Sequence, residues 1–226
     1  MLSDNKFYGI YRGVVADSED PLELGRVKLF IPQVLGEAVT DWAWPVGGAI
    51  NQINWPYGTF YSVADQAIGV NTATLINGWA ALDTNRTSLD GSRIYAQETG
   101  DYFVKFSAMF VKTTANSGTA NLWFRVNGTN VDDSNTKVTL AGNNSEVSMS
   151  RSLILDLEAG DYIEFVASAS TTNTFLSHDN AGVGPEVPGI IATLNLIGKY
   201  KPRPNTQAWA MFEGGDPNFP VWVGVL

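Results

Sequence analysis

Apolar and polar residues alternate along much of the chain. The clearest run follows Asp101, where every second residue up to Phe110 is apolar or aromatic. A period of two is typical of a β-strand with one buried face. Shorter segments repeat the pattern: Leu122, Phe124 and Val126; Leu153, Leu155 and Leu157; Ile163, Phe165 and Ala167; Leu194 and Leu196. Short strands broken by turns such as Asn127-Gly128 predict an all-β sandwich or jelly roll.

The two ends of the chain show a different pattern. One strand is predicted over Arg26–Ile31, after an acidic, turn-rich loop from Asp17 to Gly25. The last residues predict two strands, Gln207–Glu213 and Val221–Leu226, joined by GGDPNFP. Neither end has enough strands for a barrel, but together they supply roughly five, enough for one small barrel. We therefore expect a discontinuous barrel of residues 1–50 and 202–226, with residues 51–201 inserted as a jelly roll.

Composition narrows the function classes. The chain has no cysteine, which excludes disulfides, thiolate metal sites and a cysteine nucleophile. No run approaches the roughly 18 consecutive apolar residues of a membrane span, and MLSDNKFYGIYRG lacks the basic and apolar regions of a secretory signal. The net charge of -9 is spread along the chain. We therefore expect a soluble protein without membrane insertion.

The end segments FYGIYRGVVADSEDPLELGRVKLFIPQVLG, TDWAWPV and AWAMFEGGDPNFPVWVGVL resemble a known barrel. It is the N-terminal OB-type domain of the cell-puncturing baseplate hub protein of T-even-like contractile phages, which has relatives among type VI secretion spike proteins. The resemblance implies structural turn and motif roles for Asp20, Pro21, Gly25, Arg26, Trp42, Pro45, Glu213, Gly215, Asp216, Pro220 and Gly224. Glycines in such turns take backbone angles denied to other residues.

The middle region resembles another family. DGSRIYAQETGDYFVKFSAMF, NLWFRVNGTNVDDSNTKVTL, LILDLEAGDYIEFVAS and PGIIATLNLIGKY resemble the jelly-roll heads of complement and tumour necrosis factor proteins. Both resembled families form trimers around a threefold axis, so the resemblance implies a homotrimer. Apolar residues opposite the expected core positions predict the oligomer interface: Phe103, Met109, Ile154, Val166 and Ile197.

Carboxylates, hydroxyls and the one histidine offer little catalytic chemistry. Glu98 with Asp101, and Glu158 with Asp161, flank Gly100 and Gly160 and read as solvated turn residues, whereas glycosidases need a buried acid. His178, in FLSHDNAGVG, lacks a metal-binding companion and a G-x-S-x-G nucleophile.

Metal and cofactor sites are not indicated either. Asp132-Asp133 with Asn130 and Asn135 lack the glycine and terminal glutamate of a calcium loop. No glycine-rich phosphate cradle is present. We therefore expect no catalytic residues, no metal and no cofactor.

Nucleic-acid binding is also disfavoured. The barrel segments hold five basic residues (Lys6, Arg12, Arg26, Lys28 and Arg203) against nine acidic ones. A surplus of negative charge opposes contact with phosphates, so we expect no nucleic-acid partner.

These observations predict a non-enzymatic virion structural protein of a tailed phage, located in the tail or baseplate and assembled in the host cytoplasm. The barrel would dock onto other baseplate or tail proteins, and the jelly roll would contact a protein or a host-surface glycan. Two alternatives stay open: a glycan-binding adhesin for which the barrel is only a mount, and an enzyme that cuts cell-wall polymers.

Overall fold

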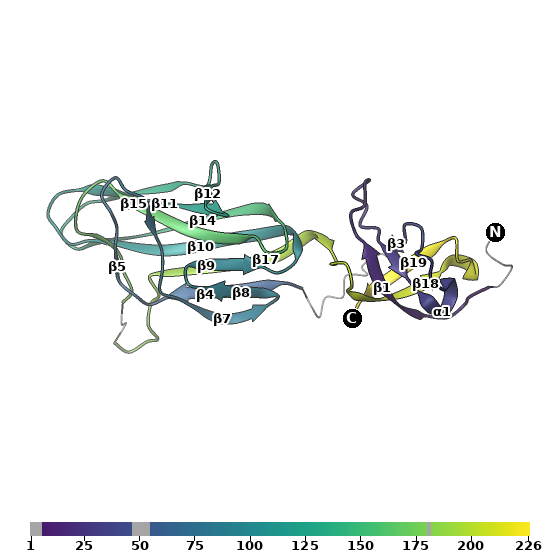
Figure 1. The fold of residues 1–226 in the computed structure, drawn as a ribbon. Helices are drawn as coiled ribbons and strands as arrows, with labels where there is room; N and C mark the ends of the chain where they lie inside the picture. The colour runs from purple at the N-terminus through teal and green to yellow at the C-terminus, as the bar shows by residue number, and fades with distance from the viewer. Residues whose placement is uncertain (1–5, 47–54, 180–181) are drawn as a thin grey trace. The chain divides into compact units, whose positions relative to one another are not determined.

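The computed structural model describes residues 6–46, 55–179 and 182–226, and most of its regular structure is β (Figure 1). The chain divides into two compact units. One contains residues 1–55, 98–100 and 198–226, and the other contains residues 56–97 and 101–197. The sequence prediction placed the domain boundaries at 50/51 and 201/202. The first of these boundaries lies outside the described residues.

The first unit contains one five-stranded sheet, ordered β2-β1-β18-β19-β3. Its strands are β1 (Tyr11–Asp17), β2 (Lys28–Phe30), β3 (Trp44–Pro45), β18 (Gln207–Phe212) and β19 (Pro220–Val225). Neighbouring strands are antiparallel except for the parallel pair β19 and β3. The sheet closes on itself, because the amides of Val27 and Ala43 each donate to the other residue's carbonyl, at 3.2 and 2.7 Å. Two segments far apart in sequence thus build one barrel.

The core of this barrel follows the predicted alternation. Val27, Leu29 and Ile31 are all buried, as their period of two predicts. The strand itself is shorter than expected and ends at Phe30 because Pro32 begins a one-turn helix, α1 (Pro32–Leu35), which the alternation did not predict. Proline favours the first position of a helix, where its missing N–H costs nothing.

The second unit is a jelly-roll sandwich of two sheets (Figure 1). The first sheet has the order β5-β16-β10-β17-β4-β7, and β14 also pairs with β10. Its strands are β4 (Tyr57–Ser62), β5 (Gln66–Ala67), β7 (Trp79–Asn85), β10 (Thr99–Lys112), β14 (Ser145–Leu157), β16 (Thr174–Leu176) and β17 (Ile190–Lys201).

The second sheet of the sandwich has the order β12-β11-β15-β9-β8, with β13 paired to β11 and β6 to β15. Its strands are β6 (Thr74–Leu75), β8 (Thr87–Asp90), β9 (Arg93–Ala96), β11 (Gly118–Val126), β12 (Thr129–Asn130), β13 (Thr136–Leu140) and β15 (Tyr162–Ala169). The protein is therefore all-β apart from α1 and the 3-10 turn η2 (Glu213–Gly215) within the described ranges.

Aromatic rings fill the space between the two sheets. The alternating residues of β10 are buried, which confirms that part of the sequence prediction. Phe106 contacts Phe124 of β11 and Phe165 of β15, with ring centroids 5.3 and 6.2 Å apart. Such tilted and edge-on arrangements are those that aromatic quadrupoles favour.

One detail of the sequence prediction is wrong. Gly100 and Asp101 lie within β10 and not at a turn, because the strand begins at Thr99. Leu153 and Leu155 point to the predicted face of β14 but are only half-buried. Alternation predicts which face a residue occupies, but not how completely neighbouring strands cover it.

The two ends of the sandwich lie side by side. Tyr57 of β4 is paired with Asn195 of β17, and the amide of Leu196 donates to the carbonyl of Pro56 at 3.0 Å. First and last strands in this arrangement let a domain enter and leave a host chain at nearly the same point.

Candidate functional site

Asp20 organises the acidic loop of the barrel. Its carboxylate accepts hydrogen bonds from the backbone amides of Leu22, Leu24 and Arg26, at 3.0, 2.8 and 3.2 Å. The Arg26 guanidinium donates to both of its oxygens. This guanidinium, above all other causes, holds the pKa of Asp20 well below its usual range. Asp20 is thus a buried, ionised anchor for the loop.

Other motif residues of the loop support the same turn. Pro21 follows the anchor directly, and Gly25 has a φ of 71°, which only glycine adopts without strain. The carbonyl of Gly25 accepts a hydrogen bond from the indole Nε1 of Trp222, 3.1 Å away. The loop is therefore fastened both to itself and to β19.

Cations and indole rings stack beside this loop. The Arg26 guanidinium lies 5.6 Å from the ring centroid of Trp42 and 5.3 Å from that of Trp44. The ammonium of Lys28 lies 4.7 Å from the ring of Trp42. Each contact is a cation–π interaction. Arg26 thus pairs with Asp20 and lies beside two indole rings.

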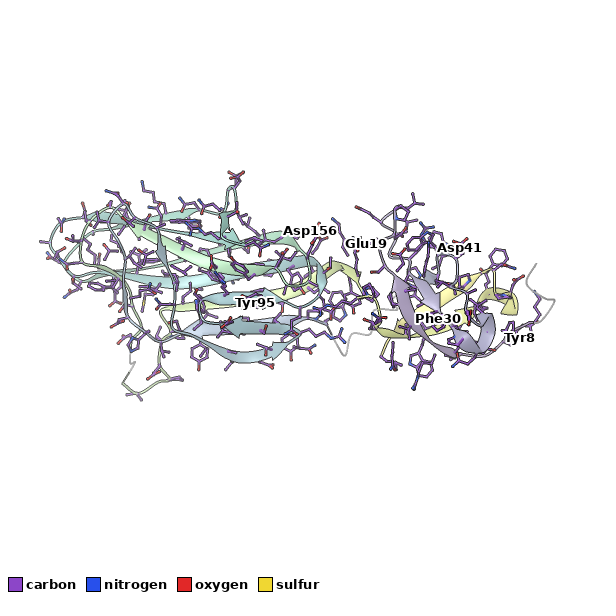
Figure 2. All side chains as sticks on the ribbon, in the orientation of Figure 1. Tyr8, Glu19, Phe30, Asp41, Tyr95 and Asp156 are labelled. Atoms are coloured by element: carbon purple, nitrogen blue, oxygen red, sulfur yellow. The ribbon has the colours of Figure 1, made fainter. Side chains whose placement is uncertain are left out.

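A hollow of about 390 Å³ opens on this cluster. Its lining comes from three separate segments of the chain: Arg26; Asp41, Trp42 and Trp44; Glu213, Asn218, Phe219, Pro220 and Val221. Trp44 and Phe219 are 53% and 60% exposed, and Asp41, labelled in Figure 2, is also exposed. The structure therefore gathers four of the predicted motif residues, Arg26, Trp42, Glu213 and Pro220, at one site.

The remaining motif residues shape the frame of the barrel. Pro45 is paired with Trp222 across β3 and β19, and Gly224 is paired with Trp209 across β19 and β18. Asp216 accepts hydrogen bonds from the amide and the side chain of Asn218, at 3.0 and 2.9 Å. The backbone hydrogen bond from Asn218 is the main cause that lowers the pKa of Asp216.

Trp44 and Phe219 contribute to the hollow but were not predicted as site residues. Trp44 stands two positions after Trp42, so a strand places both indoles on one face. The spacing of the two tryptophans could therefore have indicated that Trp44 belongs to the site. Phe219 follows Pro217 in a turn, and nothing in its local sequence indicates that it reaches the same hollow.

The predicted oligomer interface is only partly exposed. Ile154 and Ile197 are 63% and 48% exposed, and Phe103 and Met109 are half-buried. All four lie in the first sheet of the sandwich, on β10, β14 and β17, opposite the residues that face the core. Ile191 of β17, which was not predicted, is exposed on the same face.

Val166 does not belong to this interface, so that prediction is wrong. It lies on β15 in the second sheet and is fully buried within its own chain. Its cross-strand neighbours are Trp123 of β11 and Leu75 of β6. The short strand β6, which pairs with β15, could not be predicted from the alternation of β15 alone.

The residues considered for catalysis differ in their surroundings. Glu98 is not solvated as expected, because most of its side chain is buried and Arg203 Nε lies 3.7 Å from its carboxylate. Glu158 and Asp161 close a turn, in which the amide of Glu158 donates to Asp161 Oδ2 at 2.8 Å. His178 lies in a loop, and its Nδ1 lies 3.1 Å from Asp65 Oδ1. Among the described residues, no three His, Cys, Asp or Glu gather as a metal site. No described helix is both long and apolar enough to cross a membrane.

No protein-family model and no curated protein matches the sequence. Solved structures match over part of the chain. A crystal structure of murine APRIL at pH 8.5 matches with 13% identity and a TM-score of 0.42, covering 63% of this chain and 99% of that one. Eiger TNF from S. frugiperda matches with 11% identity and a TM-score of 0.44, covering 66% and 98%.

Proposed function

We propose that the protein is a non-enzymatic structural component of a tailed-phage virion, placed at the baseplate or tail tip. The barrel docks onto other tail proteins, while the jelly roll forms a homotrimer and contacts a protein or a host surface. The resemblance of the two barrel segments to phage hub proteins supports the setting. The exposed side chains of both units support a role in assembly.

We also propose that the barrel is of the OB type. Its strand order supports this assignment: β1 pairs with β2 and β18, while β3 pairs parallel with β19 and bridges back towards β2. This five-stranded order with one parallel pair is that of OB barrels. The jelly roll follows the third strand of the barrel and precedes the fourth.

The apolar outer face of the first sandwich sheet carries the proposal. Ile154, Ile191 and Ile197 expose between 39% and 63% of their surface on a face that a monomer would leave in water. Apolar side chains gathered on one sheet face mark interaction sites, and identical faces are commonly buried around a symmetry axis. A second copy of the chain is therefore the partner we assign to this face.

The barrel surface supports docking as well. Among the described residues, ten of the seventeen exposed large apolar side chains belong to the barrel unit, although it is the smaller of the two. They are Tyr8, Ile10, Leu22, Leu24, Val39, Trp44, Val46, Met211, Phe219 and Leu226. A small barrel with this much exposed apolar surface favours burial against neighbours.

Antibody labelling of particles tests the proposed location. Gold-conjugated antibodies against the purified protein are applied to virions from a phage that carries this gene, and the particles are imaged by electron microscopy. We expect label at one end of the tail. Label on the capsid, or virions that lack the protein altogether, would contradict the proposal.

A receptor-binding adhesin is the second candidate, and one feature of the sandwich favours it. The Arg93 guanidinium lies 4.5 Å from the ring centroid of Tyr162, which in turn contacts Tyr95 at 5.5 Å (Tyr95 is labelled in Figure 2). Half-buried rings beside a charged side chain are surfaces on which sugars can stack. Tight binding on a glycan array, lost in Tyr162→Ala, would favour the adhesin over the assembly role.

A further inference from the structure

We propose that the hollow of the barrel binds a cationic side chain, arginine above all, on a neighbouring structural protein. This inference rests on the proposed docking role of the barrel and names the chemistry of its partner. It follows from three observations: the pairing of Arg26 with Asp20, the excess of negative charge at the hollow, and the exposed aromatic side chains that line it.

The positive charge of Arg26, which lines the hollow, is already paired with a carboxylate. Asp20 holds Arg26 through hydrogen bonds to both carboxylate oxygens, and the nearby charge of Asp41 also raises the pKa of Arg26. Lys28, stacked on Trp42, lies 4.0 Å from Asp17. The resident cations therefore leave little positive field to attract a phosphate or a carboxylate.

The negative charge at the rim exceeds the positive charge. Asp41 and Glu213 line the hollow together with Arg26, and Arg26 is paired with the buried Asp20, so these four groups carry two more negative than positive charges. Glu213 is exposed at the start of η2 and lines the hollow. An incoming cation gains attraction to these carboxylates, whereas an anion is repelled.

The aromatic side chains that line the hollow favour a planar cation. Trp44 and Phe219 are more than half exposed and both line it. The face of an aromatic ring attracts cations, and the planar guanidinium stacks on it better than a compact ammonium does. Carboxylates beside exposed rings therefore suit arginine, a side chain that often dominates the binding energy of protein interfaces.

Fluorescence anisotropy with matched peptides tests the inference on the full-length protein. The probes are fluorescein-labelled Gly-Arg-Gly-Arg-Gly and the same peptide with citrulline, which keeps the shape of arginine but is neutral. We expect the arginine peptide to bind at least tenfold more tightly than the citrulline peptide. Because the rim is exposed to solvent, we also expect the affinity to fall as salt rises.

Variants locate the binding. Glu213→Gln and Phe219→Ala should each weaken binding of the arginine peptide at least threefold. Glu37→Gln, which removes the same charge at an exposed barrel position outside the hollow, should leave it within twofold. Equal losses in Glu37→Gln and Glu213→Gln would show unspecific attraction to an acidic protein and overturn the inference.

Three other results would also overturn it. They are the absence of arginine-peptide binding at millimolar concentration, equal binding of the citrulline peptide, and displacement of the arginine peptide by a neutral oligosaccharide. Light scattering on the same samples separates this inference from the proposed self-association. A trimer that persists while peptide binding fails refutes only the inference, whereas loss of the trimer in Glu213→Gln would assign the hollow to a second copy of the chain.

Discussion

Asp20 shows how one side chain can fix both a loop and a functional surface. It is nearly fully buried, yet it stays ionised because three backbone amides and a guanidinium surround it. The same guanidinium forms part of the wall of the hollow. The stability of the barrel and the shape of its surface therefore depend on the same ion pair.

Asp20→Ala should destabilise the barrel strongly. The substitution leaves backbone amides and the Arg26 guanidinium without their acceptor, and breaking a buried pair from one side costs about 3 kcal/mol or more. We expect a lower urea midpoint for the barrel transition, followed by tryptophan fluorescence, and little change in the jelly roll. Asp41→Asn, at the exposed rim, is the control. An unchanged barrel midpoint in Asp20→Ala would contradict the anchoring role.

The same carboxylate predicts how the barrel responds to acid. The folded pKa of Asp20 is lowered, so its contribution to stability is fully present above the unfolded value, near 3.9. It is lost as the pH falls from about 4 towards the folded pKa. Urea midpoints of the wild type should therefore drop below pH 4 more steeply than those of Asp20→Asn. Parallel curves for the two proteins would contradict the ion-pair account.

His178 and Glu158 provide a test of the non-enzymatic assignment. His178 contacts Asp65 at a partly exposed position, so His178→Ala should lower stability by less than about 1 kcal/mol. Glu158→Ala affects only an exposed turn. We expect no turnover of peptidoglycan by the wild type or by either variant in a turbidity assay. Hydrolysis by the wild type that is lost in one of them would refute the assignment.

At the scale of elements, sequence periodicity predicted the core faces well. The buried residues of β2 and β10 could be predicted from the sequence, because successive side chains of a strand point to opposite faces whatever surrounds it. The hollow as a whole could not be predicted from the sequence. Phe219 and Trp44 come to line the same hollow only because β3 and β19 pair in parallel. The interface prediction for Val166 was wrong for the same reason, because the burial of Val166 depends on the strands that pair with β15.

The turn between β18 and β19 offers a prediction at this scale. Gly214 and Gly215 have φ values of 58° and 70°, and a Cβ on Gly215 would lie 3.0 Å from the backbone nitrogen of Phe7. Gly215→Ala should therefore cost about 2 kcal/mol, from backbone strain together with this contact. Gly214→Ala, in the left-handed region at φ 58° and ψ 19° but with open space around it, should cost about 1 kcal/mol. Equal thermal shifts for the two variants would contradict the crowding argument.

At the scale of the whole molecule, the chain combines two β units with separate cores. The barrel draws its five strands from both ends of the sequence, and the sandwich begins and ends at neighbouring strands. Loop-closure entropy grows only with the logarithm of loop length, so inserting an ordered domain costs the barrel on the order of 1–2 kcal/mol. We therefore expect each unit to fold without the other.

Separate expression tests this expectation. One protein lacks residues 52–203 and joins Asn51 to Pro204 through a short Gly/Ser turn, and the other contains residues 56–202 alone. Both should give β-rich circular dichroism spectra and cooperative melting. An unfolded barrel beside a folded jelly roll would show that the barrel depends on its insert.

Self-association through the sandwich is the central claim, and light scattering coupled to gel filtration tests it most directly. At micromolar concentration the wild type should have three times the 24.5 kDa mass of the chain. Ile154→Asp with Ile197→Asp should shift it to the monomer, because charge replaces apolar surface on the contact face. Val183→Asp, at an exposed turn position outside the strands of that sheet, should stay trimeric. A monomeric wild type, or a double variant that keeps the wild-type mass, would contradict the account.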